Sequence, residues 1–288
     1  MTVVPSLGAG SSMADYRIGF KWWALIIAVV FVISELVCVA CVPERLVVCD
    51  EKPGKISDMF KALFKNDQAM TVVVSIILVY TSLTICGNLV LYFFRFDVGN
   101  EGAYSLFAAV AFAAQVLVMM VITLLRKRFS KSQLFISGFI IQIAGFAVIL
   151  IMAFAKLYTP QSWYILCLPG ILIYLGYGML NVIMTIFLSD SVDYGEVMNG
   201  TREESVIFSM QTFTVKLASG VAVFLAGLVV DWIHLDTAAA VQTQDTLDAL
   251  RMWMTIPSVI LLIVGIFVFK RFYKLDDTRM EEIKSKLN

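Results

Sequence analysis

Residues 70–94 read MTVVVSIILVYTSLTICGNLVLYFF, a run without a charged side chain. A helix needs about 20 mainly apolar residues to cross the hydrocarbon core of a bilayer, so this run predicts a membrane-spanning helix. Six further runs of this kind are separated by charged residues, glycine or proline; they are Trp22–Val42, Ala103–Leu125, Gln133–Ala155, Trp163–Leu188, Ser205–Trp232 and Met252–Phe272. The pattern predicts an all-α, polytopic membrane protein with seven transmembrane helices.

The composition points to the same class. Of the 288 residues, 60% are hydrophobic and 15% are charged, whereas soluble proteins contain about 45–50% and about 25%. Basic and acidic residues balance at 22 each, so no net charge favours nucleic acid as a partner. The only histidine is His234, and the five cysteines lack the spacing of a disulfide framework or a metal site. With no nucleophile–base pair or metal set visible, we expect neither an enzyme nor a cofactor.

The positions of the basic residues predict an orientation. If residues 1–21 lie outside, most lysines and arginines fall in inner segments, such as Arg126–Lys131 and Lys270–Lys286. Cytoplasmic loops collect lysine and arginine. We therefore predict a multi-pass protein of the cytoplasmic (inner) membrane, with the N-terminus outside and the C-terminus in the cytoplasm.

The apolar runs also divide the chain into five parts. These are an extracytoplasmic segment (1–21), a transmembrane helix (22–42), a cytoplasmic linker (43–69), a six-helix bundle (70–272) and a cytoplasmic tail (273–288). In the linker, apolar residues recur at helical spacing beside lysines, at Ile56, Met59, Phe60, Leu63 and Phe64. This spacing predicts an amphipathic helix on the membrane surface. Its simplest role is to join two helical bundles, and lipid sensing is the alternative.

Lys216 lies near the middle of a predicted span, where a charged side chain costs roughly 2.5–3.5 kcal/mol on insertion scales. The same helix places polar residues at steps of four and three, at Ser205, Ser209, Thr212, Lys216 and Ser219, with Gln211 and Val215 beside them. Such a face predicts the lining of an aqueous pathway. The alternative is that Lys216 forms an inert ion pair with a buried carboxylate.

The preceding span carries a weaker polar pattern. Gly170, Tyr174, Tyr177, Gly178, Asn181 and Thr185 recur at helical spacing, and their hydroxyl and amide groups could bind a polyol. Small and polar residues also hold membrane helices together, so packing is the alternative for this set. For Gly138, Gln142 and Gly145 we expect helix contact, whereas Tyr80 and Asn88 are further lining candidates.

The connection between the fifth and sixth spans is expected to be short and acidic. It holds one basic residue, Arg202, among Asp190, Asp193, Glu196, Glu203 and Glu204. A lone arginine among carboxylates predicts a charge network that breaks and reforms as two helix ends move. The alternative is a solvated loop with pairs of about 0–1 kcal/mol each.

Three segments of this region carry a resemblance to a known family. They are SDSVDYGE at 189–196, NGTREES at 199–205, and Phe208-Ser209 with Gln211-Thr212 up to Lys216. Together they resemble the glycoside–pentoside–hexuronide:cation symporters, a family of the major facilitator superfamily that includes the melibiose carrier. Tyr92-Phe93-Phe94 to Gly99-Asn100 looks like the end of the family's seventh helix, and Leu250-Arg251 with Pro257 like the start of its twelfth.

The resemblance implies a partial transporter fold. Members of the family have twelve spans in two bundles, and this sequence is similar to helix six, the central loop and helices seven to twelve. Residues 70–272 then form the C-terminal six-helix bundle, and residues 22–42 belong to an incomplete N-terminal bundle. The implied activity is symport of a sugar or glycoside with Na⁺ or H⁺ by alternating access, in a carrier that is here truncated.

Roles follow from the resemblance residue by residue. Lys216 matches a lysine near the cation and sugar sites, and Gln211, Thr212 and Val215 match positions close to the sugar. Asp190, Asp193 and Arg202 match a cytoplasmic gating network, to which we add Glu196 and Glu203; Ser219, Asn181 and Tyr177 complete the expected pathway. The family's cation-binding carboxylates lie in helices that this sequence lacks, and Asn181 stands where some relatives have an aromatic residue.

Several alternatives to an active symporter stay open. The chain could be an inactive remnant, one chain of a split carrier with a separate N-terminal half, or a carrier of a non-sugar solute. A seven-helix receptor also suits the number of spans. The expected partners are a sugar, the coupling cation and membrane lipid.

Overall fold

A computed structural model describes residues 13–41, 64–200, 204–239 and 241–287. The α-helices are α2 (Met13–Cys41), α4 (Asp67–Tyr92), α5 (Ala103–Leu125), α6 (Lys131–Phe154), α7 (Cys167–Asn199), α8 (Glu204–Trp232), α9 (Gln244–Phe272) and α10 (Asp277–Leu287). A π-helix, η1 (Phe93–Asp97), follows α4, and a short 3-10 helix, η2 (Trp163–Leu166), precedes α7. Within these described ranges, seven helices are long and apolar enough to cross a membrane, so the predicted all-α polytopic class is confirmed.

The chain divides into two compact units, residues 1–54 and residues 55–288. The first contributes α2, whose apolar span covers Ile18–Cys41 and includes Glu35. The predicted amphipathic helix of the linker falls outside the described residues except for Phe64, which is helical. The second unit holds the remaining helices and all of the buried core.

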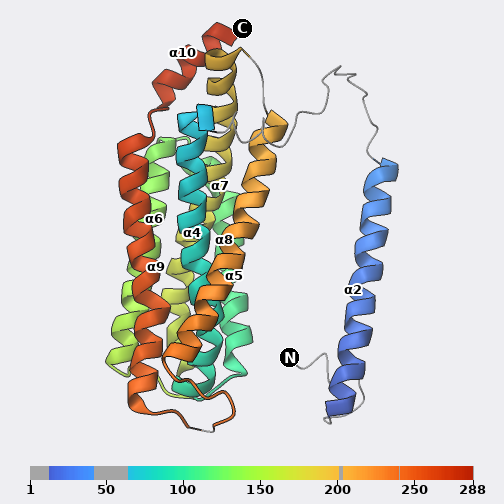
Figure 1. Ribbon diagram of the computed structural model, residues 1–288, viewed down its shortest axis with the longest axis vertical. Helices are drawn as coiled ribbons and strands as arrows, with labels where there is room; N and C mark the ends of the chain where they lie inside the picture. Colours follow the sequence, from blue (N-terminus) through green and yellow to red (C-terminus); the bar gives the residue numbers. More distant parts are fainter. Residues whose placement is uncertain (1–12, 42–63, 201–203, 240, 288) are drawn as a thin grey trace. The chain divides into compact units, whose positions relative to one another are not determined.

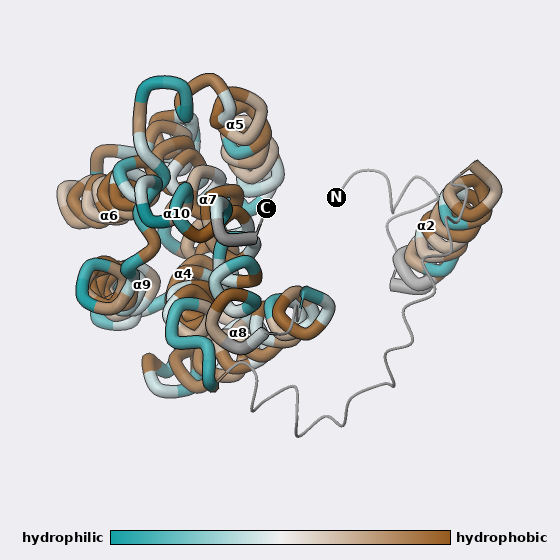
Figure 2. The backbone as a smooth tube through the Cα atoms, turned by 90° about the horizontal axis from the view of Figure 1, so that it is seen from above, coloured by the Kyte–Doolittle hydropathy of each residue, from teal (hydrophilic) through white to brown (hydrophobic). Residues whose placement is uncertain are grey.

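Within the second unit, α4 and α7 lie at the centre (Figures 1 and 2). Helix α8 packs mainly against α4, and helix α5 packs mainly against α7. On the other side of this central pair, α6 packs on α7, α9 packs on α4, and α6 and α9 contact each other. We call the end that carries α10 the tail end and the opposite end the loop end. Because α5 and α8 each pack mainly on one neighbour, both keep long exposed faces.

Helices α6 and α7 approach each other closely at glycines. A Cβ atom on Gly176 would lie 2.5 Å from the carbonyl oxygen of Gly138, and one on Gly145 would lie 2.8 Å from the backbone nitrogen of Ile173. Gln142 is fully buried in the same contact. The helix contact predicted for Gly138, Gln142 and Gly145 is therefore confirmed, and small residues serve here to let backbones meet.

Replacing Gly176 by valine should destabilise the six-helix unit. The new Cβ would meet backbone atoms of Gly138 and Gln142, so the two helices must separate, at a cost of about 1–3 kcal/mol. Thermal unfolding of the purified chain in detergent, followed by tryptophan fluorescence, measures the effect. Gly220→Val on α8 is the matched control, because a Cβ there meets nothing within 4 Å. Equal melting temperatures for the two variants would contradict the packing argument.

Helices α2, α7 and α9 extend well beyond the apolar runs that predicted them, and α2 begins at Met13, nine residues before the predicted start at Trp22. Helix α7 continues to Asn199 and ends at Gly200, whose φ of 73° suits glycine, so Asp190, Asp193 and Glu196 are helical. The sequence analysis placed these three acidic residues in the short connection between the spans, and that placement was wrong. Helix α9 begins at Gln244, eight residues before the predicted start at Met252, after Thr243 caps it by accepting a hydrogen bond from Thr246. Polar residues can continue a helix beyond the hydrocarbon layer, so the end of an apolar run does not predict the end of the helix.

Candidate functional site

A patch of polar side chains joins α4, α7 and α8. The Asn181 amide on α7 donates to the Tyr80 hydroxyl on α4, with 2.6 Å between nitrogen and oxygen. One turn further along α7, the Thr185 hydroxyl accepts a 3.4 Å hydrogen bond from the Gln211 amide on α8 and donates to the Asn181 carbonyl. We call Tyr80, Tyr177, Asn181, Thr185 and Gln211 the central patch.

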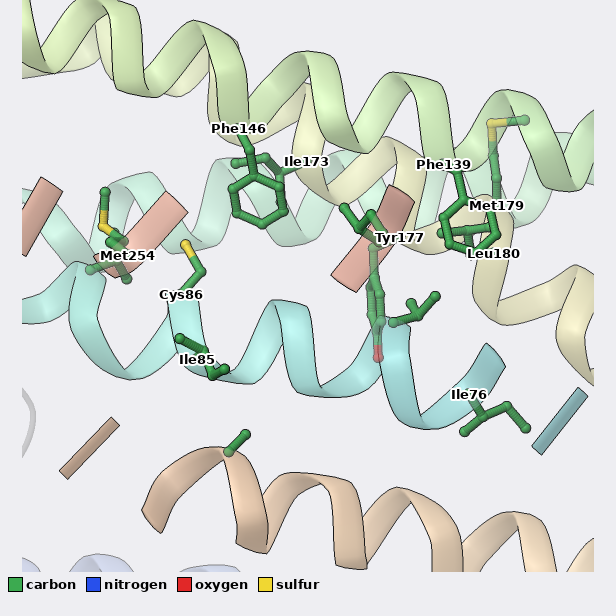
Figure 3. Close-up of a cluster of buried hydrophobic side chains, with 14 of the residues drawn as sticks. Ile76, Ile85, Cys86, Phe139, Phe146, Ile173, Tyr177, Met179, Leu180 and Met254 are labelled. Carbon is green, nitrogen blue, oxygen red and sulfur yellow. The ribbon is translucent and has the colours of Figure 1, made fainter. Parts of the chain in front are cut away.

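Aromatic rings form part of this patch. The Tyr177 ring meets the Tyr80 ring edge-on at 5.6 Å between centroids, and its hydroxyl points from α7 toward α4 (Figure 3). Buried apolar side chains, including Phe139 and Leu180, lie to the right of Tyr177 in Figure 3. Tyr80 and Asn181 are half-buried and Thr185 is exposed. The patch thus offers phenol, amide and hydroxyl groups on an otherwise apolar wall, which suits a ligand with several hydroxyl groups.

Lys216 lies on the exposed face of α8. Thr212 is exposed beside it and Ser219 is half-buried, whereas Met210, Thr214 and Ala218 are buried on another side of the helix. Among the described residues of the six-helix unit, no hydrogen bond or ion pair reaches the Lys216 ammonium. Val215, also expected in the pathway, packs against the edge of the hydrophobic core. Lys216 therefore lies on the helix that contributes Gln211 to the central patch. No described carboxylate of the six-helix unit forms an ion pair with it.

A cavity of about 630 Å³ opens between α4 and α8 near the loop end. Asn88, Tyr92 and Asp231 supply its polar groups, and leucine, valine and Phe224 supply most of the rest. Val223 and Val230 follow Ser219 at i+4 and i+11, so the cavity continues the face of α8 that carries Lys216. Asn88 lines this cavity, and its role in the pathway stays a prediction.

A buried network of charged side chains lies at the loop end. Arg251 on α9 is 2% exposed and binds the Asp97 carboxylate through two nitrogens at 2.6 and 2.8 Å. Asp248 accepts from the same guanidinium at 2.6 Å, and the Tyr158 hydroxyl donates to Asp97 at 2.7 Å. The π-helix after α4 carries Asp97. Burial, helped by the hydrogen bond to Asp97, raises the pKa of Tyr158, so this phenol stays a donor at neutral pH.

A second network of charged side chains lies at the tail end. Lys131, at the start of α6, is 5% exposed and lies 2.5 Å from Asp190 on α7 and 3.4 Å from Asp277 on α10. Leu275 and Met280 are buried in a small cluster with Tyr273 at its edge. Helix α10 is thereby held against α7. Burial and the charges of Asp190 and Asp277 raise the pKa of Tyr273.

Three of the five predicted gating residues, Asp190, Asp193 and Glu196, are among the residues that the structure describes. Asp190 is paired with Lys131, which the sequence places among the basic residues of an inner segment. Asp193 and Glu196 are half-buried on α7, and Arg202 and Glu203 lie outside the described residues. Lys131, Asp97 and Arg251 were missed as network members. The one signal in the sequence was their position at the ends of apolar runs, where a buried charge needs a partner.

Comparisons with known proteins agree with these features. Residues 1–277 match the protein family described as MFS/sugar transport protein. The isoprimeverose transporter of Lactiplantibacillus pentosus is 25% identical over 96% of this chain and 56% of its own length. An uncharacterized symporter of Bacillus subtilis (strain 168), YjmB, is 24% identical over 88% of this chain and 54% of its own. The raffinose carrier protein of Pediococcus pentosaceus is 22% identical over 81% of this chain and 35% of its own.

The chain thus spans about half the length, or less, of these relatives. The family match covers α2 and nearly all of the six-helix unit, and the relatives' names describe transporters, not enzymes. The resemblance found in the sequence is confirmed: the chain belongs to the MFS/sugar transport protein family, among the glycoside–pentoside–hexuronide type of symporters.

Proposed function

We propose that the chain supplies the C-terminal bundle of a sugar or glycoside carrier that couples transport to Na⁺ or H⁺. The observation that carries this proposal is the central patch, where Tyr80, Asn181 and Gln211 bring amide and phenol groups from three helices to one place. The names of the relatives, which include isoprimeverose and raffinose carriers, support a glycoside as substrate.

In the proposed mechanism, the sugar binds between the two bundles of the complete carrier and the bundles rock around it. Hydroxyl groups of the sugar exchange hydrogen bonds with the central patch, replacing those lost from water. Lys216 stands five residues after Gln211 on α8, and in this proposal its ammonium is the basic group of the site. A cation that neutralises carboxylates on the other bundle would then change the affinity for sugar, because the two ligands share one coupling free energy.

The proposed location is the cytoplasmic membrane, with the tail end facing the cytoplasm. The support for this orientation is the distribution of lysine and arginine, which favours the tail end. The cavity at the loop end would then face the outside and lie on the entry route of the sugar.

Uptake measurements test the proposal. The chain is expressed in cells lacking glycoside carriers, alone or together with a five-helix N-terminal fragment of a relative. Uptake of labelled melibiose, lactose, a xyloside and a glucuronide is measured with and without a sodium or proton gradient. We expect uptake only with the fragment. Uptake by the chain alone would contradict a half-carrier, and a correctly inserted pair that moves no sugar would favour an inactive remnant or another solute.

Lys216→Met should abolish accumulation against a gradient in the co-expressed carrier while downhill exchange persists. The reason is that a neutral side chain no longer responds to the charge of the cation site, so sugar and cation binding lose their coupling. The measurement is the ratio of internal to external labelled sugar at steady state. Lys284→Gln on the exposed side of α10 removes the same charge and serves as control. An unchanged accumulation ratio in Lys216→Met would refute the role.

A further inference from the structure

A second cavity lies at the tail end, between the start of α4 and the end of α9. Its volume is about 570 Å³, and it is lined by Phe64, Asp67, Met70, Thr71, Val74, Val268, Arg271, Phe272 and Lys274. None of these residues belongs to the central patch or to the two buried charge networks. The cavity therefore has no role in the transport site described above.

The mouth of this cavity is positively charged. Arg271 and Lys274 line it; Lys270, which precedes Arg271, and Lys65, which follows the lining residue Phe64, are both exposed. In the described part of the chain, no ion pair within 4 Å reaches any of these four cations. Asp67 is the acidic residue in the lining, and its carboxylate accepts a 2.7 Å hydrogen bond from the Gln68 amide. Basic side chains without an ion-pair partner at the mouth of the cavity attract an anionic ligand.

The floor of the cavity is apolar. Met70 and Val74 lie one turn apart on α4, and Val268 lies opposite them on α9; all three are half-buried and belong to membrane-spanning segments. At the mouth, Phe64 is 67% exposed and Phe272 is 49% exposed. Aromatic and basic side chains at the end of a span are typical of the membrane–water interface. The cavity thus runs from a charged interface into the hydrocarbon layer.

The walls are held in place by one buried side chain. Gln68 accepts a 2.8 Å hydrogen bond from the backbone nitrogen of Lys274 and donates to the Phe272 carbonyl at 3.4 Å. These bonds tie the start of α4 to the end of α9. The spacing between the cations and the apolar floor is therefore fixed by the fold.

We propose that this cavity binds one anionic phospholipid, with its phosphate between Arg271 and Lys274 and an acyl chain along Met70, Val74 and Val268. Unpaired basic residues at a membrane interface attract anionic headgroups, which gives the selectivity over zwitterionic lipid. A free phosphate compound would use only the charged mouth and leave the apolar floor uncovered, so the lipid fits the whole cavity. This proposal does not depend on which solute the carrier moves.

Native mass spectrometry tests the proposal. The full chain is reconstituted in an equal mixture of phosphatidylcholine and phosphatidylglycerol, transferred to mild detergent and examined for retained lipid. We expect one phosphatidylglycerol per chain. Arg271→Gln with Lys274→Gln should lower its occupancy by at least about tenfold. The control is Lys127→Gln with Arg128→Gln, which also removes one lysine and one arginine at the tail end and should leave the phosphatidylglycerol occupancy unchanged.

A second variant tests the acyl chain separately from the charge. Val74→Trp fills the apolar floor without altering a cation and should also displace the lipid, provided that the variant melts like the unmodified chain. Equal losses in the two charge variants would overturn the proposal in favour of general surface attraction. Displacement of the lipid by glycerol phosphate at equal concentration would overturn it in favour of a soluble phosphate. A dimer without lipid would assign the cavity to a second copy of the chain.

Discussion

Arg251→Met is expected to lower the stability of the six-helix unit by about 3–5 kcal/mol. Arg251 is the cation in a buried network that includes Asp97 and Asp248, and the side chain of Asp97 is only 4% exposed. Removing the guanidinium would leave the Asp97 carboxylate buried and unpaired, which costs far more than the net value of the pair. The Tyr158 hydroxyl would remain as the second donor to Asp97, and a single phenol cannot replace two charged nitrogens.

The measurement is thermal unfolding of the purified chain in detergent, followed by tryptophan fluorescence. Arg95→Met is the control, because Arg95 is exposed and lies 3.8 Å from an exposed Glu101, a pair worth about 0–1 kcal/mol. Arg251→Met combined with Asp97→Asn should regain part of the loss, since the unpaired charge is gone. If Arg251→Met and Arg95→Met melted at the same temperature, the network would not support the fold.

Lys131→Met should have a comparable effect at the tail end and should also release α10. Lys131 is 5% exposed and is the shared cation of Asp190 and Asp277. Without it, the buried Asp190 has lost its charged partner, at a cost of about 3–5 kcal/mol. The apolar contacts of Met280 and Ile283 on α10, and of Leu275 just before it, would remain. Limited trypsin digestion at Arg279 and Lys284 reports this release directly.

A double variant separates charge from packing. Lys131→Met with Asp190→Leu removes both buried charges and should recover most of the melting temperature, because apolar replacements of a buried pair are often tolerated. Its α10 should still be digested faster than in the unmodified chain, since Asp277 has lost Lys131. Lys127→Met, an exposed lysine before the start of α6, is the control. A double variant that is as unstable as Lys131→Met would show that the pair's charges are not the cause.

Much of this architecture was predictable from sequence. The thickness of the hydrocarbon layer fixes the length of an apolar run, so seven runs gave seven spans. Helical spacing placed Ser205, Thr212 and Lys216 on one face of α8, and the acidic segment at 189–205 pointed to the family. Both inferences use only local information. The helix ends were less accurate, because polar residues extend α7 and α9 beyond the apolar runs.

Partners of buried charges were not predictable in the same way. Asp97 and Arg251 are 154 residues apart, and Lys131 and Asp190 are 59 apart. Each residue stands beside a loop in the sequence, where a charge is ordinarily solvated. Only the packing of α4 on α9, and of α6 on α7, removes these groups from water and makes them neighbours. The hydrogen bond between Tyr80 and Asn181, 101 residues apart, depends on packing in the same way.

The sequence by itself therefore determined the membrane class, the number of spans and the family, because hydrophobic length, helical periodicity and a local motif are properties of neighbouring residues. The tertiary structure alone decided which polar groups meet: the central patch, the two buried charge networks and the basic cavity between α4 and α9. The physical reason is that a pairwise interaction depends on distance in space, and helix packing sets that distance for residues far apart in the chain.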